Sequence, residues 1–342
     1  MRILISSAGR RVGLMRCFRD SFRRLGVAGR IVATDASLHA PALLFADRFW
    51  RTPRCDDPAF LPRLLEMAGR EGIDLIVPTI DPELPVYAGS LDLLAHSGLR
   101  IAISAPATIA ICADKQLTHR WLRRHGFPVP RQQSLASAIS RPNGRRFPVI
   151  VKPRRGSGSN GVRRVASREE LRALAEVAQA GGWFAGHVVE EIAPGQEHTM
   201  NVFVSSRGAS LAAVPHRRME VRAGEVSKAV TVKHSGLMRL AGSIAEALPG
   251  ARGPLSIQCF LAPDGAVRVT EINARFGGGY PLTHQAGARF TDWMVEEFLK
   301  LPVRPCDDWT DNLTMLRYDR EVFLTGAAPT PADPVSVSSA AG

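Results

Sequence analysis

A lysine followed at once by a glycine-rich loop is the first feature whose residue types could carry out chemistry. Lys152 ends the apolar run F-P-V-I-V-K-P at 147–153, and the loop R-R-G-S-G-S-N-G occupies 154–161. Backbone N–H groups of such a loop can lie against phosphate oxygens, while the lysine supplies a fixed positive charge. The order is not that of a Walker loop, because the lysine precedes the glycines. The segment predicts a hairpin that folds over phosphates as a lid, with an ordinary surface hairpin as the alternative.

A strand-like run with carboxylates behind it is the second feature. Val188-Val-Glu-Glu-Ile192 is followed by Gly195-Gln-Glu197. A strand that runs into an exposed linker offers backbone donors and acceptors to the edge of an adenine, and a carboxylate such as Glu197 can accept hydrogen bonds from ribose hydroxyls. The run predicts a nucleotide hinge, with a solvated acidic loop as the alternative.

Oxygen donors two residues apart form the third and most specific feature. Glu271 and Asn273 begin the run E-I-N-A-R-F-G-G-G at 271–279, and Gln258 lies in the strand-like run before it. Residues two apart in a strand point to the same face, and carboxylate and amide oxygens suit Mg²⁺. Arg275 continues this period and would place a guanidinium where negative charge develops during phosphoryl transfer. The alternative is a buried structural pair between Glu271 and Arg275.

The elements that must position these groups begin with an alternating pattern over about the first 110 residues. Short apolar runs alternate with amphipathic stretches, which predicts a parallel sheet with crossover helices. The runs and stretches are Ile3–Ser6, Gly13–Leu25, Ile31–Thr34, Ala59–Arg70, Leu75–Pro78, Ser90–Ser97 and Arg100–Ile103. Ligands of such sheets sit at the carboxyl ends of the strands. The substrate-binding candidates at those ends are Ser7, Asp35, Asp81 and Glu83.

A dinucleotide site is the tempting interpretation of this first domain, since Gly9 opens a helix and Asp35 follows the next strand-like run. The loop, however, carries Arg10 and Arg11 where a second glycine should let the backbone approach a pyrophosphate. We therefore reject NAD binding.

The remaining elements change in character along the chain. A helix is expected from Asp114 to about His125, and Ser167 with Glu170 fits a capping box at the start of another. Further on, several antiparallel-looking strands are followed by helices and strands expected at Leu237–Leu248, Ser256–Leu261, Val267–Thr270, Phe290–Lys300 and Leu313–Arg317. The last residues, rich in Ala, Pro, Ser and Thr, are expected to be a disordered tail.

Composition excludes several classes of protein. The 342 residues are too many for one ordinary core, and they carry neither an apolar run that would span a bilayer nor a signal peptide, so a cytoplasmic protein without a membrane partner is expected. The five cysteines are odd in number and widely spaced, which predicts neither disulfides nor a zinc site. The net charge is +12, but the arginine pairs are spread along the whole chain and no basic run is interleaved with aromatics. We therefore expect no nucleic-acid partner.

Taken in order, a lysine and glycine lid, a nucleotide hinge and a metal carboxylate resemble the ATP-grasp superfamily, in particular one half of the carbamoyl-phosphate synthase large chain with a preceding α/β domain. The motifs are A-D-K at 113–115, V-I-V-K-P at 149–153, V-V-E-E-I and G-Q-E within 188–197, and E-I-N-A-R-F-G-G-G at 271–279. The resemblance implies an α/β chain with a Rossmann-like pre-ATP-grasp domain (1–112) and a two-lobed α+β ATP-grasp fold. Its lobes would be the small lobe with the lid (113–193) and the C-terminal lobe with the metal site (194–325), before the tail (326–342).

The resemblance also assigns residues. Lys115 and Lys152 would contact ATP phosphates under a lid made by Gly156, Ser157, Gly158 and Gly161. Glu190, Glu191 and Ile192 would lie at the adenine, and Glu197 at the ribose. Gln258, Glu271 and Asn273 would hold Mg²⁺ or Mn²⁺. Arg275, with Lys152, would act in catalysis by steadying the reacting phosphoryl and acyl groups.

The resemblance implies an ATP-dependent ligase that converts a carboxylate to an acyl phosphate and joins it to an amine. The alternatives are phosphorylation of carbamate or bicarbonate, and an ATP-binding module without catalysis. Small-molecule carboxylate and amine substrates and a homodimer are expected. Arg218 and Lys233, with their neighbours Arg217 and Lys228, would suit an anionic substrate such as an acidic amino acid.

Overall fold

The N-terminal domain is built on a parallel sheet, as the alternating pattern predicts. The computed structural model describes residues 1–141, 146–156, 158 and 160–324. The sheet order is β3-β2-β1-β4-β5, and the strands are β1 (Arg2–Ser6), β2 (Arg30–Asp35), β3 (Arg48–Arg51), β4 (Leu75–Pro78) and β5 (Arg100–Ile101). β1 is buried along almost its whole length, as expected for a central strand covered on both faces. Because β2 and β4 flank β1 on opposite sides, a crevice opens at the carboxyl ends of β1 and β4.

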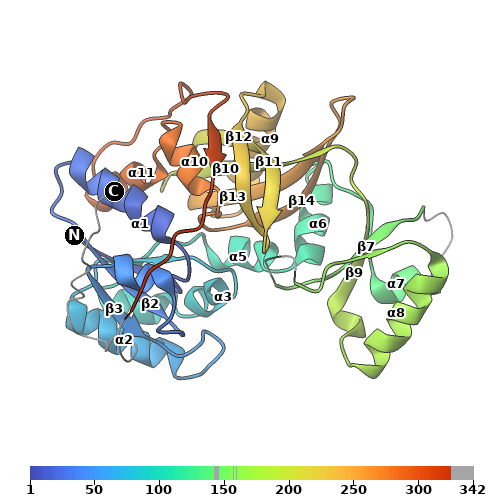
Figure 1. Ribbon diagram of the computed structural model, residues 1–342, viewed down its shortest axis with the longest axis horizontal. Helices are drawn as coiled ribbons and strands as arrows, with labels where there is room; N and C mark the ends of the chain where they lie inside the picture. Colours follow the sequence, from blue (N-terminus) through green and yellow to red (C-terminus); the bar gives the residue numbers. More distant parts are fainter. Residues whose placement is uncertain (142–145, 157, 159, 325–342) are drawn as a thin grey trace.

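Helices cover this sheet (Figure 1). They are α1 (Val12–Arg24), η1 (Pro41–Phe45), α2 (Phe60–Glu71), α3 (Glu83–Ala88), α4 (Leu91–His96) and α5 (Pro106–Cys112). α6 (Lys115–Arg124) packs against α5 and also against two strands further along the chain, β6 (Gln132–Ser134) and β14 (Val267–Asn273). The predicted helices are thus confirmed within a residue or two, the usual uncertainty at helix ends.

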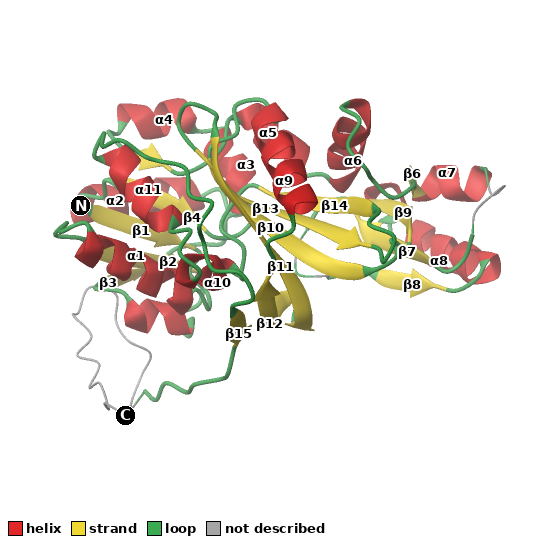
Figure 2. Ribbon diagram, turned by 90° about the horizontal axis from the view of Figure 1, so that it is seen from above, coloured by secondary structure: helices red, strands yellow, loops and turns green. Residues whose placement is uncertain are grey.

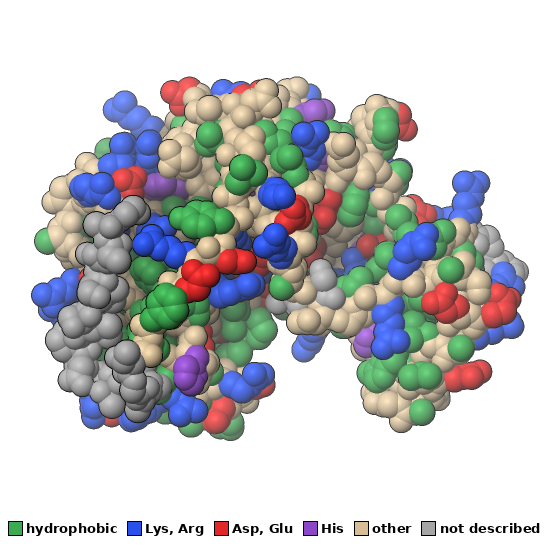
Figure 3. Space-filling view, viewed as in Figure 1, with side chains coloured by type: hydrophobic (Ala, Val, Ile, Leu, Met, Phe, Trp, Pro, Cys, Tyr) green, Lys and Arg blue, Asp and Glu red, His purple; other side chains and the backbone are tan. Residues whose placement is uncertain are grey.

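The small lobe has an antiparallel sheet of order β6-β9-β7-β8 and its own apolar core. Its elements are β6 (Gln132–Ser134), α7 (Leu135–Ser140), β7 (Val149–Pro153), β8 (Arg163–Val165), α8 (Arg168–Ala180), η2 (Phe184–Gly186) and β9 (His187–Glu191). Ser167 caps α8 by accepting a hydrogen bond from the Glu170 N–H, while the Glu170 carboxylate accepts from Ala166 N–H. Figure 3 shows this lobe projecting from the rest of the molecule.

A six-stranded antiparallel sheet of order β14-β13-β10-β11-β12-β15 forms the third lobe. Its elements are β10 (Gln196–Val204), β11 (Ser210–Arg222), β12 (Glu225–Thr231), α9 (Ser235–Ala247), β13 (Gly253–Leu261), β14 (Val267–Asn273), α10 (Tyr280–Gln285), α11 (Phe290–Phe298) and β15 (Thr314–Leu316). Figure 2 shows it between the N-terminal domain and the small lobe. β14 reaches Asn273, beyond the predicted end at Thr270, because it pairs with β13 as far as Ser256.

The N-terminal domain and the third lobe share their apolar cores, whereas the small lobe does not. One cluster joins Leu4 and Ile76 to Leu237 and Ile257, and the other joins Phe18 of α1 to residues of α10 and α11. All five cysteines are free. None of the helices in the described part of the chain has the length and apolar character that crossing a membrane requires. The expected tail, 326–342, lies outside the described residues.

Candidate active site

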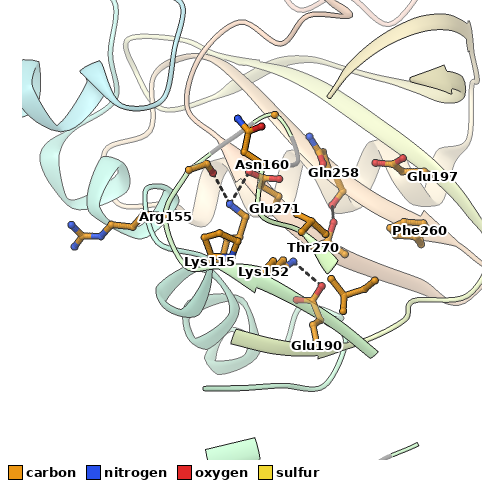
Figure 4. A pocket seen from close by; sticks show the side chains of 15 residues that line it. Lys115, Lys152, Arg155, Asn160, Glu190, Glu197, Gln258, Phe260, Thr270 and Glu271 are labelled. Atoms are coloured by element: carbon orange, nitrogen blue, oxygen red, sulfur yellow. Dashed lines mark hydrogen bonds and ion pairs between the residues drawn. The ribbon is translucent and has the colours of Figure 1, made fainter. Parts of the chain in front are cut away.

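A cavity of about 260 Å³ lies where the small lobe meets the third lobe, and we call it the lid cavity. It gathers residues from all three predicted motifs (Figure 4). The predicted residues that line it are Lys115, Lys152, Gly156, Gly158, Glu190, Glu197, Gln258 and Glu271. Residues as far apart in the sequence as Lys115 and Glu271, 156 positions, thus face one space.

Lys152 is held at the end of β7 by a buried ion pair. Its Nζ donates to Glu190 Oε1 of the neighbouring strand β9 at 2.7 Å, and both side chains are almost fully buried. Gln132 Nε2 donates to the other oxygen of Glu190 at 2.8 Å. Glu190, predicted to lie at an adenine, therefore uses its carboxylate to fix the lysine.

Lys115 links the lid to the third lobe. Its Nζ donates to the backbone oxygen of Gly156 at 2.7 Å and lies 3.5 Å from Glu271 Oε1 (Figure 4). The preceding Asp114 caps α6 by accepting from the N–H groups of Gln116 and Leu117. Burial acts to raise the pKa of Asp114, but hydrogen bonds from Arg154 and the helix lower it below its ordinary value. Asp114 thus tethers the start of α6 to the base of the lid.

The predicted metal-binding oxygens lie side by side on β13 and β14. Gln258 is paired with Glu271, and Ser256 with Asn273. Glu271 lines the lid cavity, Asn273 lines a second cavity, and Gln258 lines both. Among the described residues no three side chains of His, Cys, Asp or Glu form a metal cluster. The predicted metal ligands are therefore one carboxylate, that of Glu271, and the side-chain amide oxygens of Gln258 and Asn273.

The second cavity, of about 200 Å³, lies between the crevice of the N-terminal domain and the third lobe, and we call it the arginine cavity. Its charged and ionisable lining is Arg10, Arg11, His216, Arg218, Glu225 and Arg275. Gly158 and Gln258 line both cavities. The two spaces therefore adjoin at the lid and at the predicted metal-binding strand.

Ion pairs fix the arginines of this cavity. Arg275 pairs with Asp81 of the N-terminal domain, and burial acts to lower the pKa of Arg275 while Asp81 raises it above the ordinary value. Arg218 pairs with Glu197, whose side chain also lines the lid cavity. Glu197, predicted to lie at a ribose, thus connects the two cavities.

Of the six predicted substrate residues, only Arg218 lines the arginine cavity. Glu83 is fully buried, and its carboxylate accepts from Ser6 and Ser7 hydroxyls and from the Thr79 and Ile80 N–H groups. Glu83 and Ser7 therefore brace the loops at the crevice, which corrects the expectation that they face a ligand. Asp81 instead orients Arg275.

The other two substrate candidates lie elsewhere. Asp35 accepts from Gly9 N–H and Ser37 N–H and lines a separate open hollow of the N-terminal domain. Lys233 Nζ lies 5.2 Å from the ring centre of Trp309 and does not line either cavity. A position directly after a strand thus did not identify a ligand-facing residue, because a side chain at that position can also point into the protein or along its surface.

Arg10, Arg11, His216 and Glu225 are the site residues that sequence reasoning missed. Arg10 and Arg11 lie in the loop between β1 and α1, so their position beyond the carboxyl end of a central strand was a usable signal. The other two depend on the path of the β11–β12 hairpin, which no sequence motif indicates.

The residues of the predicted lid lie partly at the lid cavity. Gly156 and Gly158 line the lid cavity, whereas Gly161 lies against Pro153. Ile192 is 40% exposed and Glu191 is half-buried, and neither lines the lid cavity. Ser157 lies outside the described residues.

The sequence is similar to known families over most of its length. Residues 3–102 match the PylC-like N-terminal domain, and residues 112–279 match the ATP-grasp domain. The chain is 27% identical over 244 residues to phosphoribosylamine–glycine ligase of Xylella fastidiosa strain Temecula1, which covers 64% of this chain and 56% of that protein. It is 26% identical over 235 residues to the vancomycin resistance protein VanB of Enterococcus faecalis, covering 61% and 67%. The chain thus spans little more than half the length of the first of these relatives.

Solved structures share the fold. Biotin carboxylase from Campylobacter jejuni superposes with a TM-score of 0.74 at 18% identity, over 92% of this chain and 74% of that one. The L-amino acid ligase of Bacillus licheniformis gives a TM-score of 0.64 at 20% identity, over 89% and 75%. With its PylC-like N-terminal domain, its ATP-grasp domain and a shared fold over about nine-tenths of its length, the chain belongs to the ATP-grasp superfamily.

Proposed function

We propose that this chain is an ATP-dependent ligase that activates a small carboxylate as an acyl phosphate and joins it to an amine, releasing ADP and phosphate. The observation that carries this proposal is the junction of the two cavities at Gly158 and Gln258. One side offers lysines and a glycine loop, which suit phosphates. The other side offers buried guanidinium groups, which suit a carboxylate.

ATP would occupy the lid cavity. Lys115 and Lys152 would face its phosphates under Gly156 and Gly158, and Glu197 would accept from the ribose hydroxyls. Solved structures of the same fold include a complex of biotin carboxylase with β,γ-ATP and a complex of carboxyaminoimidazole ribonucleotide synthase with ATP. These likenesses support nucleotide binding in the same fold.

Gln258, Glu271 and Asn273 would hold Mg²⁺ or Mn²⁺. The donor set fits, because Mg²⁺ usually binds through one or two carboxylates together with phosphate oxygens and waters. When bound, the ion would neutralise part of the negative charge of the phosphates.

Arg275 would act at the junction. A substrate carboxylate oxygen would attack the γ-phosphorus in line, forming an acyl phosphate and breaking the bond to ADP. Arg275, oriented by Asp81, would stabilise the negative charge of the reacting groups. The amine nitrogen would then attack the acyl carbon, expelling phosphate and losing a proton. The lid would exclude water from the acyl phosphate.

The test is release of ADP by the purified protein with Mg-ATP and a panel of carboxylates, amines and bicarbonate, with mass spectrometry of the products. Glu271→Gln should lower turnover about a hundredfold, whereas Glu176→Gln on the exposed face of α8 should not. An amide product supports the ligase. Turnover with bicarbonate alone would indicate carboxyphosphate chemistry, and tight ATP binding without turnover would indicate a binding module.

We also expect a homodimer, in keeping with the resemblance to the family. Light scattering after gel filtration measures the mass in solution, and a monomer at working concentration would contradict it.

A further inference from the structure

Positive charge is in excess around the arginine cavity. Within the described residues, the guanidinium groups of Arg10, Arg11, Arg218 and Arg275 line it, against the single carboxylate of Glu225. Arg317 adds a further positive charge behind Glu225, at 3.0 Å. Since Asp81 and Glu197 pair with Arg275 and Arg218, three carboxylates face five guanidinium groups. Arg11, Arg218 and Arg275 are largely shielded from water, whereas Arg10 is exposed. Like charges gathered away from water are costly, and an anion would relieve that cost.

Several hydrogen-bond donors in this cavity have no acceptor among the residues that the structure describes. The Nε atoms of Arg218 and Arg275 and both ring nitrogens of His216 are buried without a partner. Burial, with Arg218 and His198 nearby, lowers the pKa of His216 to about 3, so the ring is neutral at pH 7 and keeps one N–H. Because buried donors are nearly always satisfied in folded proteins, these donors point to a ligand rich in acceptors.

The charges are arranged in two groups. Arg275 lies near Glu271, at the junction with the lid cavity, where the proposed phosphoryl transfer takes place. Arg11 and Arg10 enter from the N-terminal domain, and Arg11 pairs with Glu225 at 3.2 Å. Arg11 and Arg275 are close enough for each charge to affect the other. A carboxylate beside Arg275 would therefore leave Arg11 and Arg10 facing the rest of the same molecule.

We propose that the carboxylate substrate is a small dianion, with one carboxylate beside Arg275 to be phosphorylated and a second acidic group held by Arg11 and Arg10. The inference rests on the proposed ligase function. A cavity of about 200 Å³ limits the substrate to a compact molecule, since pockets for drug-sized ligands usually exceed about 300 Å³. The second acidic group is a carboxylate or a phosphate, and both have the oxygen geometry that guanidinium groups bind.

The experiment is calorimetric titration of the protein saturated with Mg²⁺ and a non-hydrolysable ATP analogue. Aspartate, glutamate, phosphoserine, succinate and 2-oxoglutarate are compared with asparagine, glutamine and serine. At least one compound with two acidic groups should bind at least tenfold more tightly than the compounds with one, which corresponds to about 1.4 kcal/mol. Whether a dicarboxylate or phosphoserine binds decides between the two acidic groups.

Arg11→Gln should reduce that affinity to the level of the compounds with one acidic group, whereas Arg63→Gln, in an exposed pair on α2, should leave it unchanged. Equal affinity of acid and amide for the wild-type protein overturns the inference without any variant, and so does a panel in which no dianion binds. Failure of the ATP analogue to bind would instead contradict the proposed function.

Discussion

At the scale of single residues, the site is held together by charge pairs rather than by apolar packing. Lys152, Arg218 and Arg275 each have a carboxylate partner from another element. Such pairs fix the direction of a long side chain before a ligand arrives, which reduces the entropy lost on binding. The partners Glu190, Glu197 and Asp81 are therefore as necessary to the geometry as the cations themselves.

The pair of Lys152 and Glu190 should be costly to break. Lys152→Met leaves the buried carboxylate of Glu190 without its cation, and removing one partner of a buried pair costs about 3–5 kcal/mol. We expect a loss in this range in the free energy of unfolding, measured by urea denaturation. The double variant Lys152→Met, Glu190→Gln should recover part of it. A double variant no more stable than the single one would contradict this account.

His216 should make the protein sensitive to acid. Its pKa, lowered by burial to about 3 in the folded state, stands near 6.5 in the unfolded chain. Between these values the unfolded chain binds the extra proton, so the folded state is fully favoured above pH 6.5 and loses stability as the pH falls.

The measurement is the free energy of unfolding of His216→Phe and of wild type from pH 7 to pH 4.5. The difference should move in favour of the variant by up to about 1.4 kcal/mol for each pH unit. His39→Gln, at an exposed position, is the control and should run parallel to wild type. A difference for His216→Phe that does not vary with pH would show that the ring takes up no proton on unfolding.

At the scale of elements, the β11–β12 hairpin and the lid meet backbone to backbone. A Cβ atom added at Gly224, in the turn of the hairpin, would lie 2.5 Å from Cα of Gly158 in the lid. Gly224 also has a positive φ of 76°, which disfavours other residues. The backbone of this hairpin in the third lobe thus packs directly against the backbone of the lid, over the junction of the two cavities.

Gly224→Ala should therefore disturb the lid. We expect turnover to fall by about tenfold or more, since a displacement of about 1 Å in a catalytic site can cost up to about a hundredfold. Gly208→Ala is a matched control, because Gly208 has a φ of 83° but no atom within 4 Å of the added Cβ. Both variants should lose comparable stability in thermal unfolding, while only Gly224→Ala loses activity. Equal activity in the two variants would mean that the contact does not position the lid.

At the scale of the whole molecule, the apolar cores group the three parts of the chain into two units, whereas the sequence motifs indicate three. The N-terminal domain and the third lobe share two apolar clusters, so neither buries its apolar face alone. The small lobe has a separate core around Leu171, Leu174, Val149 and Val189 and projects from the rest (Figure 1). The lobe that carries the lid is therefore the part that can open without unfolding the remainder.

Leu171→Ala should reveal this division. The substitution should cost about 2–5 kcal/mol, and hydrogen exchange should accelerate only in the small lobe, in β7, α8 and β9. Ile257→Ala, in the shared core, should accelerate exchange in the N-terminal domain and the third lobe together. Acceleration throughout the chain in Leu171→Ala would show that all three parts unfold as one unit.

The local elements, and the meeting of the motifs at one cavity, could be predicted from the sequence. The strand Leu75–Pro78 has the predicted bounds, and Lys152, Gly156, Glu197 and Glu271 face one cavity as the motifs indicate. These predictions succeed because a strand alternates its side chains with a period of two and a helix with 3.6, so apolar periodicity is written locally. The assignment of these residues to one site came from the order of the motifs, which resembles that of the ATP-grasp superfamily.

Only the tertiary structure decided which charges meet. Asp81 and Arg275 are 194 positions apart and pair across two lobes, Glu83 turns inward to brace the crevice, and Arg11 reaches Glu225 of the distant hairpin. No local period encodes such contacts, because a long charged side chain on a loop can take many directions. The sequence alone thus determined the elements and the motifs of an ATP-grasp domain, whereas the meeting of the lobes determined the arginine cavity, where the proposed substrate would bind.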